Sequence, residues 1–87
     1  MDYKNIGERL TLLRQEKGLS QEELAEMLNV DKRKIARYET SMVLPDIDVL
    51  IKLSNVFNTS IDYLACITDV RDKFPKKKRT IFKLFNR

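Results

Sequence analysis

The 87-residue sequence contains no histidine, no tryptophan, one cysteine, two glycines and two prolines. Without histidine, neither a Ser-His nor a Cys-His nucleophile pair can form, and an ordinary zinc site is excluded. Two separated glycines, Gly7 and Gly18, cannot build a phosphate-binding loop. The single Cys66 cannot form an intramolecular disulfide, so nothing requires an oxidising compartment. We therefore expect a binding module, not an enzyme, with no catalytic residues, metal or cofactor.

Long apolar runs are also absent. No stretch approaches the roughly 20 apolar residues of a membrane span, and the polar residues 1–5 lack the apolar core of a signal peptide. Hydrophobic residues make up 43% of the chain, enough for one small core. We expect a single cytoplasmic domain, with membrane binding unlikely on these grounds.

The charges divide the chain into two parts. Residues 1–68 hold nine basic and eleven acidic residues, a net charge of −2, whereas residues 69–87 hold eight basic and two acidic residues, a net charge of +6. This division predicts a folded domain over 1–68 and a basic tail over 69–87. Within the acidic part, residues 31–37 carry four basic residues and one acidic residue. The window is either a footprint for a polyanion or a solvated helix face.

Five segments place apolar residues at helical spacing and are separated by short loops, whereas no segment alternates with the period of a strand. The first segment runs from about Asn5 to Lys17. The expected start caps are Ser20 (with Glu23 as its capping-box partner), Asp31 and Ser60, and the expected ends are Gly18, Asn29 and Asn58. The inward residues expected are Ile6, Leu10, Leu13, Leu24, Ala25, Leu28, Ile35, Tyr38, Ile47, Leu50, Ile51, Leu53, Phe57, Ile61, Leu64 and Ile67. The sequence therefore predicts a compact all-α bundle of five helices.

The second and third expected helices have the spacing of a helix-turn-helix. Counted from Gln21, the small Ala25 lies four residues on, Asn29 eight, Ile35 fourteen and Tyr38 seventeen. A small residue lets the third helix cross closely, Asn29 tolerates a left-handed turn, and the two large residues seat the third helix.

With Ile35 and Tyr38 inward, the third helix turns a basic face outward. This face contains Arg33, Arg37 and Thr40, flanked by Lys34 and Ala36, with Lys32 at the helix start. Arginine offers a bidentate fork to guanine, and a short alanine fits a thymine methyl. We therefore expect the helix to enter a DNA major groove.

Three segments and one proline together resemble the phage-repressor and Cro-type (Xre-like) helix-turn-helix family. They are residues 19–25 (LSQEELA), 35–39 (IARYE) followed by Pro45, and 60–64 (SIDYL). The resemblance implies a five-helix, lambda-repressor-like DNA-binding domain that acts as a dimer on palindromic operators. It also implies that Gln21 anchors the DNA backbone, that Lys32, Arg33 and Arg37 read bases, and that Glu39 is the acid at the helix end.

The loop after the third helix departs from the family, which often has a glycine and cations there. Thr40 and Ser41 can still donate to a phosphate, but Met42, Val43 and Leu44 are apolar. We expect these three residues to fold back onto the core. The alternative is a small apolar patch for a protein partner.

The tail begins with a linker-like stretch over 69–75, followed by a basic run over 76–79 and an apolar segment over 81–85. Three interpretations stay open: a helix docked on the bundle or on a second protomer, a cationic arm attracted to phosphates, and an amphipathic segment on a membrane. Cys66 is expected to be a small buried hydrophobe, with a redox role as the alternative.

Together these features predict a sequence-specific DNA-binding transcriptional regulator, in particular a repressor of bacterial or phage type that forms a homodimer. Phosphate contacts are expected from Gln21, Lys34, Thr40 and Ser41, and base contacts from Lys32, Arg33, Ala36 and Arg37. The alternative is a protein-interaction or antitoxin-like module, with a partner at the 42–44 loop or the 81–85 segment.

Overall fold

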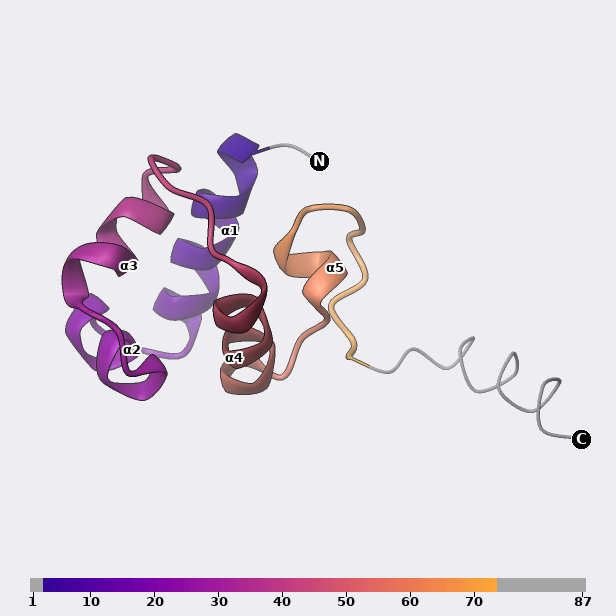
Figure 1. The fold of residues 1–87 in the computed structure, drawn as a ribbon. Helices are drawn as coiled ribbons and strands as arrows, with labels where there is room; N and C mark the ends of the chain where they lie inside the picture. The colour runs from indigo at the N-terminus through magenta and orange to yellow at the C-terminus, as the bar shows by residue number, and fades with distance from the viewer. Residues whose placement is uncertain (1–2, 74–87) are drawn as a thin grey trace, which may run out of the picture.

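The computed structural model describes residues 3–73, which form five helices in a bundle (Figure 1). The helices are α1 (Tyr3–Glu16), α2 (Gln21–Leu28), α3 (Lys32–Glu39), α4 (Ile47–Phe57) and α5 (Ile61–Leu64). No strand occurs among these residues. The predicted all-α five-helix architecture is confirmed.

The helix ends follow from residues that satisfy the free backbone groups of each terminus. Ser20 forms a complete capping box with Glu23, and Asp31 and Ser60 accept from backbone N–H groups of α3 and α5. Gly18 and Asn29 adopt left-handed φ values of 70° and 57°, the conformation that glycine and asparagine tolerate best. These predictions from the sequence are confirmed, so local chemistry sets where α1 and α2 end and α3 begins.

The core joins all five helices. Its members are aliphatic side chains from all five helices, with one tyrosine from α3 and another from α5. The cluster contains Leu10, Leu13, Leu24, Ala25, Leu28, Ile35, Tyr38, Val49, Leu53, Tyr63 and Leu64.

Three expected core positions are wrong. Ile47 and Ile51 on α4 are 60% and 45% exposed, because α4 turns Val49 and Leu53 inward instead. Ile67 is 65% exposed, because α5 already ends at Leu64 and the helical spacing no longer applies beyond it. Helical spacing therefore marked more apolar residues in and after α4 and α5 than the neighbouring helices bury.

After α5 the chain turns back along the bundle, and we call residues 68–73 the strap. Backbone and hydroxyl groups of Thr59 and Ser60 donate to the carbonyl oxygens of Val70 and Arg71 at 2.7–3.2 Å. Arg9 of α1 donates to the carbonyl oxygen of Thr68 at 3.0 Å. The strap is thus anchored to α1 and to the start of α5, where the sequence indicated a linker.

Cys66 lies just beyond α5, half-buried and with a left-handed φ of 62°. Full burial of its side chain was therefore wrong. The basic run 76–79 and the apolar segment 81–85 lie outside the described residues, so the three interpretations of the tail stay as predictions.

Candidate nucleic-acid interface

Helix α3 is seated by one face and open on the other. Asp31 caps its start by accepting from the backbone N–H of Arg33 at 2.8 Å. Ile35 is fully buried and Tyr38 is 4% exposed, so both point into the core. Arg33 and Arg37 lie opposite this buried pair, with Lys34 on the flank and Lys32 at the helix start, and all four side chains are exposed. The predicted orientation of the helix is therefore confirmed, and four cations share one solvent-facing surface, which we call the cationic face.

The four cations differ in what they contact. Arg33 folds back onto its own N-cap, and its guanidinium lies 3.3 Å from the Asp31 carboxylate. The hydrogen bonds from Arg33 lower the pKa of Asp31 below its ordinary value, so the pair stays ionised. Lys32, Lys34 and Arg37 form no ion pair with any residue in 3–73. Three of the four cations are thus available to an anion, while Arg33 has to leave Asp31 first.

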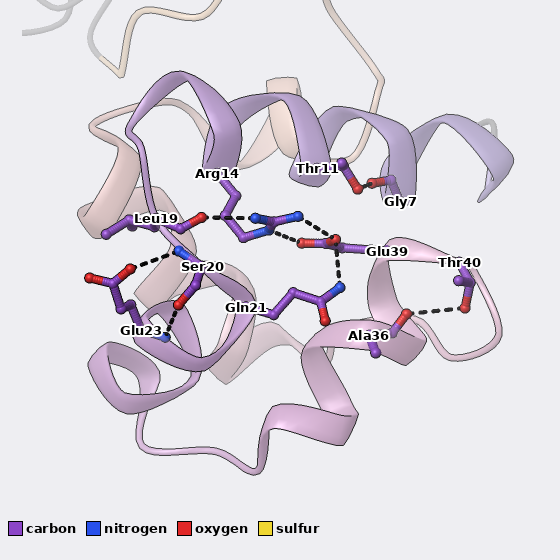
Figure 2. A network of polar contacts seen from close by, with 10 residues as sticks. All are labelled: Gly7, Thr11, Arg14, Leu19, Ser20, Gln21, Glu23, Ala36, Glu39 and Thr40. Carbon is purple, nitrogen blue, oxygen red and sulfur yellow. Dashed lines mark hydrogen bonds and ion pairs between the residues drawn. The ribbon is translucent and has the colours of Figure 1, made fainter.

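A second set of polar groups joins α1, α2 and α3 (Figure 2). Arg14 of α1 binds the Glu39 carboxylate at the end of α3 with two hydrogen bonds of 2.6 and 3.1 Å. Gln21, the first residue of α2, donates its amide N–H to the same carboxylate at 3.0 Å. The Arg14 guanidinium also donates to the Leu19 carbonyl oxygen at 2.8 Å. We call Arg14, Gln21 and Glu39 the polar joint.

The polar joint is nearly closed to water. The side chains of Arg14 and Glu39 are only 14% and 6% exposed. Burial by itself would raise the pKa of Glu39, but the hydrogen bonds from Arg14 and Gln21, together with the Arg14 charge, outweigh it and lower that pKa. The carboxylate therefore stays charged, and the joint sets the position of α3 against α1 and α2.

A close approach of backbones adds to this joint. A Cβ atom placed on Gly7 of α1 would lie only 2.7 Å from the carbonyl oxygen of Tyr38, and it would also overlap the carbonyl oxygen of Glu39. Real Cβ atoms essentially never come so near to backbone atoms. Glycine is thus required at Gly7 for α1 to cross the end of α3.

The remaining predicted contact residues lie around the cationic face. Ala36 is half-buried on α3, and the Thr40 hydroxyl donates back to the Ala36 carbonyl oxygen at 3.1 Å (Figure 2). Ser41 follows with a left-handed φ of 63°. The amide of Gln21 is engaged by Glu39, which orients its side chain at the start of α2. Gln21 therefore lies on the helix next to α3, and Thr40 and Ser41 follow the end of α3.

The loop after Ser41 does not fold back onto the core, so that expectation is wrong. Met42, Val43 and Leu44 are 76%, 47% and 44% exposed. The turn continues α3 instead, because Met42 and Val43 both donate backbone N–H groups to the Arg37 carbonyl oxygen. Val43 and Leu44 line a hollow on the surface. The other residues that line it are Lys34, Arg37, Tyr38 and Asp46.

No pattern in the sequence pointed to Arg14 or to the role of Gly7. Arg14 follows the buried Leu13 on an amphipathic helix, where an arginine is ordinarily a solvated residue. Glu39 was singled out only through the family resemblance. No group of metal-ligating side chains suited to an ion exists within residues 3–73, and no helix in this range is long and apolar enough to cross a bilayer.

The fold and the outward basic helix define a small all-helical domain in which two helices cross over a tight turn, the second of them seated by Ile35 and Tyr38. The chain belongs to the helix-turn-helix family, whose model matches residues 10–64.

The chain is similar to known regulators of transcription. It is 41% identical over 76 residues to the HTH-type transcriptional regulator ImmR of Bacillus subtilis, a match that covers 87% of this chain and 57% of that protein. The chain thus spans little more than half the length of this relative.

Two solved structures share its fold at appreciable identity. The P22 c2 repressor protein, solved in complex with a synthetic operator, is 32% identical with a TM-score of 0.66, covering 68% of this chain and 89% of that one. The N-terminal DNA-binding domain of SinR from Bacillus subtilis is 38% identical with a TM-score of 0.64, covering 69% and 88%.

Proposed function

We propose that the chain is a sequence-specific DNA-binding transcriptional regulator of the repressor type, which reads a major groove with α3. The observation that carries the proposal is the cationic face, four basic side chains exposed on a helix whose other face is buried. The likeness to a repressor solved on its operator supports it, as does the likeness to a DNA-binding domain.

The chemistry of each side chain suggests its part in binding. Lys32, Arg33 and Arg37 are proposed to reach base edges, because the N-terminal part and outer face of a recognition helix lie deepest in the groove. Ala36 is proposed to meet a thymine methyl, which a short apolar side chain fits.

Phosphate contacts are proposed for a second group of residues that position the protein without reading sequence. These residues are Gln21, Lys34, Thr40 and Ser41. The amide of Gln21 is oriented by Glu39 at the N-terminus of α2, and helix N-termini attract phosphate. Because Gln21 is hydrogen-bonded to Glu39, a phosphate contact at Gln21 would help to set the position of α3 on the DNA.

We further propose that the chain acts as a homodimer on a palindromic operator in the cytoplasm, by binding and not by catalysis. Family membership supports this, because two-fold symmetric operators present two half-sites to two copies of one domain. One domain of this size reads few base pairs, so two copies raise both affinity and specificity.

The test is a fluorescence-anisotropy titration of the chain against a randomised DNA pool at about 50 and 200 mM salt, with sequencing of the bound fraction. An enriched palindromic motif is expected. In the same assay Arg37→Ala is expected to lose about 1–3 kcal/mol of discrimination at particular base pairs.

Lys17→Ala is the matched control, because Lys17 is an exposed cation beside Phe57 and Arg71, away from α3. It removes the same charge and is expected to leave the motif unchanged. Salt-sensitive binding without an enriched motif would contradict reading by α3, and so would equal effects of the two substitutions.

The alternative is a protein-interaction or antitoxin-like module. The exposure of Met42, Val43 and Leu44 favours it, because apolar side chains beside a basic surface suit a protein partner. The comparisons favour DNA binding. The alternative gains weight only if the titration enriches no motif.

A further inference from the structure

Four partly exposed apolar side chains follow one another from the loop after α3 onto α4. We call them the apolar strip: Val43, Leu44, Ile47 and Ile51, with exposed fractions of 47%, 44%, 60% and 45%. On α4, residues Ile47, Ile51 and Asn55 lie at intervals of four, so they follow one another along one side of the helix. Nothing within residues 3–73 covers the strip, although burial of such side chains is favourable.

The last described residue, Lys73, lies near the Ile51 end of this strip. The ammonium group of Lys73 is hydrogen-bonded to the side-chain carbonyl oxygen of Asn55, one helical turn beyond Ile51. The strap holds this position through its bonds to Thr59, Ser60 and Arg9. The remainder of the chain therefore starts from an anchored point beside α4.

Fourteen residues follow Lys73, and they include apolar side chains that could cover the strip. The segment 80–85 reads TIFKLF, preceded by the basic run 76–79. Asn55 and Ile47 are eight residues apart on α4, or about 12 Å along the helix axis. The six residues 74–79 can span up to about 20 Å, so segment 80–85 can reach Ile51 and Ile47.

The strip suits an attached segment better than a second copy of the chain. A stable interface between two proteins involves roughly 20 residues on each side, whereas the strip has four. A segment on a short tether is present at an effective concentration in the millimolar range, so a weak contact suffices. At the start of α4, Asp46 accepts from the backbone N–H of Val49 and shares a hollow with Lys34 and Arg37. Asp48 follows in the first turn of α4, and its carboxylate is opposite in charge to the basic residues of the tail.

We propose that the C-terminal segment 80–85 of the chain docks on the apolar strip of its own protomer. Phe82 and Phe85 cover Ile47 and Ile51, and the basic run is brought alongside α4. Val43 and Leu44 share their hollow with Lys34 and Arg37. The docked segment therefore borders the cationic face at Lys34 and Arg37.

Disulfide trapping in the full chain tests this directly. In a Cys66→Ser background, Ile51→Cys is combined with Phe82→Cys, and oxidation is followed by mass spectrometry and non-reducing electrophoresis. A cross-linked monomer is expected to form about tenfold faster than in the control that pairs Phe82→Cys with Leu12→Cys. Leu12 is 48% exposed on α1 and matches Ile51 in exposure. Equal rates in the two pairs would overturn the proposal, and so would cross-linking only between two copies.

A second measurement needs no added cysteine. Backbone amide chemical shifts of the full chain are compared with those of the Phe82→Ser/Phe85→Ser variant, with Thr80→Ser as a control. We expect changes at residues 43–51 in the double variant and none around Leu12. Unchanged shifts at the strip would contradict the proposal. Neither experiment contains DNA, so their failure would leave the proposed function unaffected.

Discussion

Two arginines of α1, Arg14 and Arg9, connect this helix to opposite ends of the bundle in different ways. Arg14 is paired with the nearly buried carboxylate of Glu39. Arg9 lies 4.0 Å from the centre of the Tyr63 ring and donates to backbone carbonyl oxygens, while its one acidic partner, Asp69, is 98% exposed. The main partner of the first arginine is thus a nearly buried carboxylate, whereas the second contacts an aromatic ring, backbone carbonyl oxygens and an exposed carboxylate.

This difference predicts different behaviour of the two ends. A buried ion pair is costly to break, because the remaining charge stays in a poorly solvated place. A partly exposed arginine over an aromatic ring loses little when one contact is removed. The joint that positions α3 should therefore be rigid and sensitive to substitution, whereas the end that holds the strap should be tolerant.

The largest effect is expected at Glu39. Glu39→Ala leaves the Arg14 charge without its partner and should lower the free energy of unfolding by about 3 kcal/mol. Urea unfolding followed by circular dichroism measures it. The matched variant Arg14→Met/Glu39→Leu removes both charges and should recover most of the loss. If the double variant is no more stable than Glu39→Ala, the unpaired charge is not the cause.

The next effect is expected where α1 crosses the end of α3. Gly7→Ala forces a Cβ against the carbonyl oxygen of Tyr38 and should cost about 2 kcal/mol, since backbone has to move. Gly18→Ala is the comparison, because a Cβ there meets nothing within 4 Å but must take a φ of +70°. It should cost only about 1 kcal/mol. Thermal unfolding of both variants checks the order, and a reversed order would contradict close packing at Gly7.

A smaller effect is expected where Arg9 of α1 contacts α5 and the strap. Arg9→Met should lower the free energy of unfolding by about 1 kcal/mol, because the aliphatic stem still packs while the cation over Tyr63 is lost. Hydrogen exchange should accelerate at amides of the strap and remain unchanged in α3. Faster exchange throughout α3 would show that the two ends are not independent.

The smallest effect is a pH dependence of the free energy of unfolding that comes from Glu39 in the polar joint. The pKa of Glu39 is lowered in the folded state, so its contribution is fully present above the unfolded value of about 4.3. That contribution is lost as the pH falls through the lower, folded pKa. The stability of the wild type should therefore fall more steeply below about pH 4.3 than that of Glu39→Gln. Parallel curves from acid titrations of unfolding would contradict an ionised Glu39 in the joint.

The elements that could be predicted from the sequence are those governed by neighbours along the chain. Ser20 with Glu23 and Asp31 marked helix starts, and Gly18 and Asn29 marked turns, because each acts on backbone groups within four residues. The inward placing of Ile35 and Tyr38 followed from helical spacing, and with it the exposure of the cationic face.

The rest depended on contacts between distant segments. Arg14 and Glu39 are 25 residues apart, and no spacing rule relates them. Ile47 and Ile51 looked like core residues because an apolar row does not show how much of it a neighbouring helix covers. The loop at Met42 was expected inside, since its composition is apolar, but its backbone continues the end of α3 and keeps it outside.

The sequence alone therefore determined the helices, their ends and which side of α3 faces the solvent, because these depend on local backbone chemistry and periodicity. Only the tertiary structure decided how α3 is held and where the strap lies. It also decided which apolar residues stay exposed. Those outcomes depend on which groups meet across the bundle, and a buried charge or a close backbone approach acquires its partner only once the helices are packed.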